Sequence, residues 1–494
     1  AIAGGRCQSG DFGSGCAGLG NMRASRDRLP GASDDVAPAA VRVLPLASTF
    51  CSPGWRDGVI MRRRSRVSAR RATLVPATPG CEAWWLTIEV HVRETLPWNM
   101  TGTKGLSHQN TEPTTMKLRT VACLTAAIVV LALGARAQDR IRREINIPDI
   151  PGYVTLKCDF HIHTVFSDGT VWPSIRADEA WMDGMDAIAI TDHIEYQPHK
   201  DDLPTKHNRS YEIAKAQGDT LGLIVIRGAE ITRSMPPGHF NAIFLKDTEA
   251  LATPEWRDSI NAALKQGAFV FWNHPGWTGQ QPDGVGRWYA EHDELLAKGA
   301  MHGIEVVNGT SYYPEAHKWC LEKKLTMLCN SDEHTPISFS YGRSPDDHRP
   351  ITLVFAEKRT AAAIKDALVN RRTAVYSKNL LVGEEQFLRP IFERSIRVIP
   401  PPSAIKGTGR VYTQIRNTSD ITYQLRLRGE VDDVTAPGSI ELTAGRTVLM
   451  ELRGRATAEA GKKTVALPYR VDNLLVAPDR GLDVTIKVDV ELVK

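Results

Sequence analysis

The chain has 494 residues, 42% of them hydrophobic, and a formal net charge of +4, which is enough for two or three domains with a sizeable core. Because composition and total charge are ordinary, they indicate neither a nucleic-acid-binding nor a membrane protein. The charge is uneven, however: residues 1–115 hold 13 Arg and one Lys against nine Asp and Glu, a net charge of +5.

Residues 1–115 do not resemble a folded domain. They contain Gly-, Ser- and Pro-rich runs, a basic cluster at 62–66 and little sustained periodicity. We expect this segment to be disordered, or to be sequence that lies upstream of the natural start. A basic arm for nucleic acid or anionic lipid is the alternative interpretation.

Residues 116–137 have the pattern of a secretory signal peptide. Lys117 and Arg119 precede an apolar run at 121–134, and Ala135-Arg-Ala137 supplies a small-x-small cleavage site. The run of 14 residues is shorter than the roughly 17 to 25 needed to span a bilayer. We therefore predict that Met116 starts the natural protein and that the product is secreted or periplasmic. An uncleaved membrane anchor is the alternative.

The mature chain, from Gln138 onward, carries 44 basic and 48 acidic residues and is slightly acidic, at −4. It has no predicted membrane span and no basic stripe, so we expect no nucleic-acid partner. Of eight cysteines only Cys158, Cys320 and Cys329 remain. This odd, sparse count argues against a disulfide scaffold, and the apolar runs around Cys158 and Cys329 predict buried thiols. No oligomeric state is predicted.

Strand and helix patterns alternate from residue 152 to about residue 375, and we place one domain at 138–385. The expected strands are 154–160, 186–191, 223–230, 240–245, 268–273, 303–308 and 325–330, with helices such as 173–183, 254–266 and 314–323 between them. This alternation predicts parallel pairing and a closed, TIM-like barrel. No Gly-rich phosphate loop follows the first strand, which argues against a Rossmann fold.

The pattern changes at residues 386–494. Three prolines at 400–402 indicate a linker, and short alternating runs at 410–416, 422–428 and 482–490 are separated by turn residues. This predicts a small antiparallel β-sandwich of immunoglobulin type. The segment contains no histidine, so we expect it to have a packing or attachment role. A carbohydrate-binding module is the alternative.

Polar residues gather where the barrel strands end. His161 and His163 point to the same side of the first strand, so both imidazoles can reach one metal ion. The nine candidate ligands are His161, His163, Asp168, His193, Glu230, His239, His274, Asp332 and His334. Because the carboxyl ends of barrel strands form one face, these residues should converge. His239 is a misfit because it precedes its strand; either that boundary is wrong or its loop folds over the mouth.

These motifs together resemble the polymerase and histidinol phosphatase (PHP) family of metal-dependent phosphoesterases. The matching segments are Asp-Phe-His161-Ile-His163, Ser-Asp168-Gly, Ile-Thr-Asp-His193, Gly-Ala-Glu230, Gly-His239, Asn-His274-Pro and Ser-Asp332-Glu-His334. They cover about residues 154–375, and the long matches at 164–169 and 189–195 resemble secreted bacterial phosphodiesterases. The resemblance implies a distorted (β/α)7 barrel with a trinuclear site, here followed by the β-sandwich.

The resemblance also implies a division of the ligands among three metal ions. His161, His163 and Asp332 would hold the first ion, with Glu230 bridging to the second. His239 and His274 would complete the second site, and Asp168, His193 and His334 would hold the third. Six imidazoles and three carboxylates suit Zn²⁺, Mn²⁺ or Fe²⁺, up to three per chain, rather than Mg²⁺ or Ca²⁺.

The expected activity is hydrolysis of small organic phosphodiesters through a metal-bound hydroxide, because clustered ions neutralise phosphate oxygens and lower the pKa of water. Asp192 is expected to orient a ligand, with general base as the alternative role, and Arg233 is a candidate phosphate clamp. Aromatic residues near the mouth favour a diester: Tyr196, Phe240, Trp272, Trp277, Tyr312 and Tyr313. The alternative is that these rings pack the barrel.

Three other functions stay open. A phosphomonoesterase of the same family would use the same ions. An amidohydrolase-like hydrolase would commonly carry a carbamylated lysine at a strand end, where this chain has Glu230. A non-catalytic binding module would have lost the site, whereas nine intact ligands would be costly to bury without metal.

Overall fold

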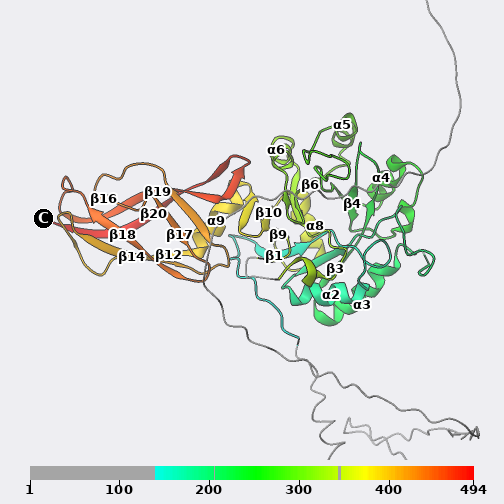
Figure 1. Ribbon diagram of the computed structural model, residues 1–494, viewed down its shortest axis with the longest axis horizontal. Coiled ribbons are helices and arrows are strands. Elements are labelled where there is room, and N and C mark those ends of the chain that lie inside the picture. Colours follow the sequence, from blue (N-terminus) through cyan, green and yellow to red (C-terminus); the bar gives the residue numbers. More distant parts are fainter. Residues whose placement is uncertain (1–139, 205, 343–346) are drawn as a thin grey trace, which may run out of the picture. The chain divides into compact units, whose positions relative to one another are not determined.

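The computed structural model describes residues 140–204, 206–342 and 347–494 (Figure 1). The segment 1–115 and the predicted signal peptide 116–137 therefore lie outside the described residues. No helix within the described residues is long and apolar enough to cross a bilayer.

All seven expected barrel strands form, each within two residues of its predicted bounds. They are β1 (Val154–Asp159), β2 (Ala187–Ile190), β3 (Ile224–Ile231), β4 (Phe240–Ile243), β5 (Phe269–Trp272), β6 (Gly303–Asn308) and β8 (Thr326–Asn330), with a short β7 (Ser311–Tyr312) after β6. The predicted helices are α2 (Pro173–Met182), α4 (Trp256–Lys265) and α6 (Pro314–Lys323), joined by α3 (Arg209–Leu221), α5 (Ala290–Ala297), α7 (Ile337–Ser340) and the 3-10 turn η1 (Glu249–Leu251). Both α2 and α6 begin at a proline, whose fixed φ suits a first helical turn.

The barrel is not wholly parallel, so that part of the sequence prediction is wrong. Strands β1, β2 and β3 pair in parallel, as do β5, β6 and β8, but β4 is antiparallel to both β3 and β5. The reason is chain length. Only residues 232–239 join β3 to β4, whereas a parallel crossover needs about a dozen residues or more. His239 precedes a reversed strand, so it lies at the carboxyl ends of its neighbours.

Three further strands extend the barrel sheet beyond β1, and the sequence analysis missed them. They are β9 (Ile351–Ala356), β10 (Thr373–Ser377) and β11 (Leu380–Gly383), accompanied by α8 (Ala361–Val369) and α9 (Glu385–Ser395). Strand β9 pairs antiparallel with β1. Thr352 of β9 both donates to and accepts from the Cys329 backbone of β8 at 2.8 Å, and the Thr373 hydroxyl donates to the Met327 carbonyl. Threonine hydroxyls thus provide hydrogen-bond partners for backbone groups of β8 that no neighbouring strand of the described chain pairs.

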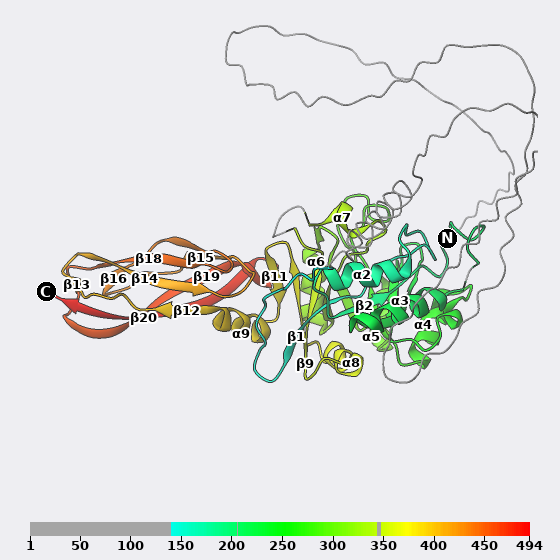
Figure 2. The same cartoon turned by 90° about the horizontal axis from the view of Figure 1, so that it is seen from below.

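The strands are buried on both faces, as their apolar runs predict. One core cluster fills the barrel interior and includes Cys158, Ala189 and Phe271, with Ile364 of α8 packed against it. On the outer face, residues such as Ile188 join the cluster that includes the inner face of α2. Helices α2 and α3 lie side by side along β2 and β3 (Figures 1 and 2). All three described cysteines are buried and free, which confirms the prediction for Cys158 and Cys329.

Residues from 396 onward form the predicted β-sandwich. Its strands are β12 (Ile396–Ile399), β13 (Ile405–Lys406), β14 (Arg410–Asn417), β15 (Tyr423–Leu427), β16 (Val434–Thr435), β17 (Ser439–Leu442), β18 (Thr447–Gly454), β19 (Gly461–Ala477) and β20 (Arg480–Val493). One sheet has the order β12-β14-β18-β16 and the other β13-β20-β19-β15-β17. Burial alternates strictly along β14 and almost throughout β20, as expected where one face of each sheet meets the core.

A buried ion pair ties the end of β1 to the segment before β9. The Asp159 carboxylate accepts hydrogen bonds from the Ser331 hydroxyl at 2.6 Å and the Ser331 backbone N–H at 3.1 Å. It also pairs with Arg349 at 3.2 Å, and Arg349 in turn binds Asp183 at 2.9 Å. Both Asp159 and Arg349 are buried, so the pair holds the Ser331 turn, which precedes the ligand Asp332, against β1.

We predict that Arg349→Met lowers the free energy of unfolding by about 3–5 kcal/mol, because it leaves the Asp159 carboxylate buried without its counter-charge. Urea unfolding of the mature chain, followed by tryptophan fluorescence, measures the change. Arg257→Met is the control, since Arg257 is exposed and pairs with Glu294 at the surface. Equal midpoints for the two variants would contradict the assigned role of the buried pair.

Candidate metal centre

All nine predicted ligands converge at the carboxyl ends of the barrel strands. Six of them are buried: His161, His163, His193, Glu230, His239 and His274. The side chains of Asp168, Asp332 and His334 keep 22%, 18% and 34% of their surface exposed. Solvent therefore reaches the cluster at Asp168 and His334, and the six buried residues lie away from solvent.

Glu230, at the end of β3, is the centre of the cluster. Its Oε2 lies 3.3 Å from His161 Nε2, 3.3 Å from His163 Nε2 and 3.0 Å from His193 Nδ1. Its Oε1 lies 2.8 Å from His239 Nδ1 and 3.6 Å from His274 Nε2. One carboxylate thus faces five imidazoles through its two oxygens, the arrangement expected of a bridging ligand.

Two groups of donor atoms share Glu230 and overlap the predicted first and second metal sites in part. Asp332 Oδ1 lies 3.2 Å from His161 Nε2 and 3.0 Å from His163 Nε2, beside Glu230. His161, His163 and Glu230 form a group whose donor atoms all lie within 4.8 Å of one another, and so do His193, Glu230 and His239. The second group includes His193, which the resemblance assigns to the third ion.

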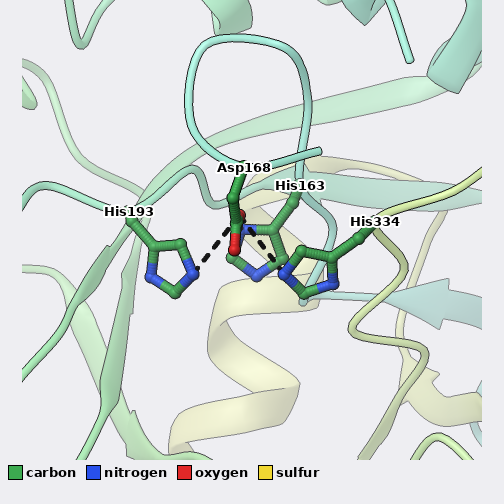
Figure 3. A group of neighbouring side chains, drawn as sticks. All are labelled: His163, Asp168, His193 and His334. Carbon is green, nitrogen blue, oxygen red and sulfur yellow. Dashed lines mark ion pairs between the residues drawn. The ribbon is translucent and has the colours of Figure 1, made fainter. Parts of the chain in front are cut away.

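The third group surrounds Asp168 and is the most exposed (Figure 3). Asp168 Oδ1 lies 3.5 Å from His193 Nε2, 3.3 Å from His334 Nε2 and 3.8 Å from His163 Nδ1. Figure 3 shows the Asp168 carboxylate between the rings of His193 and His334. Since His163 and His193 each belong to two groups, the division of ligands among three ions stays a prediction.

His239 reaches the cluster because β4 is reversed. Neither alternative from the sequence was needed: the strand boundary is correct, and residue 239 already lies at the mouth. His239 stacks edge-on against His274, with ring centroids 4.9 Å apart, and its carbonyl accepts a hydrogen bond from the Asn273 N–H at 3.0 Å.

The electrostatics of the cluster favour bound cations. Burial raises the pKa of Glu230, but the facing His193, His161 and His239 hold it well below the ordinary value. Burial lowers the pKa of His161, but Asp332, Glu305 and Glu230 raise it well above the usual range. Protons and metal ions therefore compete for the same ring nitrogens. The donor set of imidazole and carboxylate groups fits transition-metal ions.

Glu305 on β6 supports the cluster, and sequence reasoning missed it. Its Oε1 lies 2.8 Å from His161 Nδ1, which leaves Nε2 of that ring directed at Glu230 and Asp332. Its Oε2 accepts the His274 backbone N–H at 2.8 Å. A ligating histidine commonly binds a carboxylate through its other nitrogen. The signal was present, because Glu305 is a charged residue inside an otherwise apolar strand.

Asp192 supports the turn that carries Asp168. Its carboxylate accepts hydrogen bonds from the Thr164 N–H at 2.7 Å, the Thr164 hydroxyl at 2.8 Å and the Ser167 hydroxyl at 2.9 Å. These contacts fit the predicted orienting role better than that of a general base. Its part in catalysis stays a prediction.

Arg176 of α2 joins the two loops that carry ligands, and it too was missed. Its buried guanidinium donates to the carbonyls of His163 at 2.8 Å, Glu333 at 2.8 Å and Thr335 at 2.7 Å. A single planar cation therefore fixes the loop after β1 against the loop after β8, where Asp332 and His334 lie.

Arg233, the predicted phosphate clamp, is turned into the protein. One terminal nitrogen donates to the Pro254 carbonyl at 2.9 Å; the other donates to the Thr253 carbonyl at 2.8 Å and pairs with Glu195 at 2.7 Å. Its Nε is buried. In this conformation Arg233 anchors the loop between β3 and β4, and its role as a clamp stays a prediction.

Two of the six aromatic residues named from the sequence face an open cavity. Tyr196 and Trp277 are 53% and 45% exposed and line a cavity of about 600 Å³ beside Asp168, His193 and His239. Phe240, Trp272 and Tyr313 are buried, and Tyr312 binds His317 at 2.9 Å. Packing is therefore the correct interpretation for Phe240, Trp272 and Tyr313.

A barrel of this kind with a buried cluster of imidazoles and carboxylates at one mouth defines a metal-dependent hydrolase. The chain is 45% identical to a two-domain protein from Bacteroides vulgatus containing a predicted PHP-like metal-dependent phosphoesterase, with a TM-score of 0.67. The match covers 72% of this chain and 100% of that one. The chain therefore belongs to the PHP-like metal-dependent phosphoesterases, which confirms the resemblance.

Two other comparisons match parts of the chain. Residues 396–487 match a family model described as an Ig-like domain, which confirms the predicted sandwich type. A protein of Methanocaldococcus jannaschii is 28% identical over 192 residues, which span 37% of this chain and 83% of that protein.

We predict that the mature chain binds two or three first-row transition-metal ions, and that Glu305→Gln weakens metal affinity by about 10–100-fold. A glutamine side chain has an NH2 group in place of one carboxylate oxygen. This group would face either His161 Nδ1 or the His274 N–H, which now contact Oε1 and Oε2 of Glu305. Metal analysis after dialysis against graded chelator measures the loss.

The exposed Glu322 of α6 provides the matched control, as Glu322→Gln. Metal retention equal to that of this control would remove the supporting role of Glu305. Less than one ion per wild-type chain, with Zn²⁺, Mn²⁺ and Fe²⁺ supplied, would contradict the metal centre itself.

Proposed function

We propose that the protein hydrolyses small organic phosphodiesters at this centre. The observation that carries the proposal is the cavity beside Asp168, His193 and His239, which has aromatic walls and a paired arginine. A phosphomonoester is a dianion and needs additional cationic donors, whereas a diester needs space on both sides of phosphorus. The cavity has space for a second ester substituent, and its one permanently cationic side chain, Arg233, is already paired with Glu195.

Metal ions bound here would neutralise the phosphate oxygens, lower the pKa of a water molecule and stabilise the leaving alkoxide. The chain contributes the geometry. Glu230 holds five imidazoles around one point, Glu305 fixes the ring of His161, and Asp192 fixes the turn of Asp168. The buried floor directs substrate to the partly exposed side, at Asp168 and His334.

We further propose that the protein is exported through the signal peptide at 116–137 and acts outside the cytoplasm. The three cysteines of the described chain support this proposal, because all are buried and burial raises their thiol pKa values. Such thiols are poor nucleophiles and resist pairing in an oxidising compartment.

For the bond type, we predict a higher kcat/KM for an aryl diester than for the matched aryl monoester, and near-complete loss of both activities in Glu230→Gln. The substitution removes the one negative charge that Glu230 spreads over its two oxygens, and it replaces one of these oxygens by an N–H donor that faces the imidazoles. Glu322→Gln is again the surface control. A clear preference for the monoester would refute the diester proposal and leave the metal centre standing.

For export, we predict that a gene starting at Met116 yields secreted, active enzyme with Gln138 at its amino terminus. N-terminal sequencing of the exported protein checks the cleavage site. If the shorter gene gave only cytoplasmic protein while the full sequence was exported, the assignment of the signal would be wrong.

A further inference from the structure

Two exposed aromatic side chains, Trp277 and Tyr196, line the cavity beside the centre, and each contacts the ring of a predicted metal ligand. The Trp277 ring lies 5.6 Å from the His239 ring and 5.4 Å from the His274 ring, centroid to centroid. The Tyr196 ring meets His193 edge-on at 6.0 Å. Two exposed rings that line one cavity beside a cluster of imidazoles and carboxylates form a local apolar surface, and this clustering indicates a binding surface.

The polar groups around these rings are nearly all uncharged. Thr232, Ser234 and Gln280 line the cavity, and the Gln280 amide donates to the Arg233 carbonyl at 2.8 Å. Among the lining residues in the described chain, Arg233 carries the one permanent positive charge, and Glu195 neutralises it at 2.7 Å. Beyond the metal ligands, the cavity therefore presents aromatic surface and neutral hydrogen-bonding groups.

Size and charge together restrict what can enter. A volume of about 600 Å³ exceeds what a methyl or ethyl group would fill. A second anionic group would find that the one permanently cationic lining residue, Arg233, is already paired with Glu195. A flat, neutral ring can cover Trp277 and Tyr196 and retain favourable dispersion and quadrupole contacts.

We infer that the cavity binds one ester substituent of the substrate and that this substituent is a neutral aromatic group stacked on Trp277 and Tyr196. The inference rests on the proposed function, since the phosphate has to lie over Asp168, His193 and His239 while the ring extends between the walls. The two aromatic residues then determine specificity and do not take part in bond cleavage.

A binding experiment tests the inference without turnover. Benzyl(methyl)phosphinate and dimethylphosphinate are both monoanions and have no ester bond, and in the first a CH2 group replaces the ester oxygen. Calorimetry with the metal-loaded mature protein should give about tenfold tighter binding of the benzyl compound. Trp277→Ala should remove most of this difference without changing the affinity for dimethylphosphinate, and Trp277→Phe should restore it.

Tyr196→Ala provides an independent variant at the second exposed ring of the cavity. Its matched control is Tyr412→Ala, which removes a similarly exposed tyrosine from the β-sandwich. Metal content is measured for every variant, so that damage to the centre is recognised. The thymidine and phenyl esters of methylphosphonate both keep a cleavable P–O bond, so each is measured as a competing substrate. Their comparison distinguishes a ring carried on a sugar from a ring bonded through the ester oxygen, and strong competition by either supports the inference.

Equal affinity for the two phosphinates would overturn the inference, and so would equal weakening of both by Trp277→Ala at unchanged metal content. If diesters are still cleaved in that case, the proposed function survives. If neither metal nor diester activity is found, the proposed function fails first, so the two failures can be distinguished.

Discussion

The site depends on one buried carboxylate. Glu230 has no exposed surface, and an ionised carboxyl group in such a place costs several kcal/mol unless charges or donors compensate it. Five imidazoles do so, and they come from the ends of β1, β2 and β5 and from the start of β4. Because these ends meet only in the folded barrel, the site is assembled by the tertiary fold and not by any one segment.

The reversed strand β4 is what completes the ring of ligands around Glu230. An eight-residue connection cannot carry a helix back across the barrel, so the chain turns and returns beside β3. As a result the start of β4 delivers His239 to the face where the other strands end. A local constraint on chain length thus supplies a ligand that regular βα alternation would have placed at the opposite end of the barrel.

Much of the fold could be predicted because buried strands appear in the sequence as short apolar runs. The candidate ligands could be predicted because they directly follow those runs. The supporting residues are different. Glu305 meets His161 across 144 positions of sequence, and Arg349 meets Asp159 across 190, so only the topology reveals these pairs. The same holds for Phe240 and Trp272, whose burial depends on which face of β4 and β5 packs against α5 and not on any local pattern. Strand β9 is an equally apolar run, Ile-Thr-Leu-Val-Phe-Ala, and it was missed although the same signal was present.

The eight residues that connect β3 to β4 both line the cavity and carry a candidate metal ligand. Thr232, Ser234 and Met235 form a wall of the cavity, and His239 at the end of the same segment contacts Glu230. An insertion or deletion that reshaped this wall for a new substrate would also displace a ligand. The loop after β5, by contrast, carries the cavity residues Trp277 and Gln280 and runs to α5 without another candidate ligand, so a change of its length would leave the metal centre in place. Natural variation in chain length should concentrate there, and the β3–β4 connection should keep its length even where its residues change.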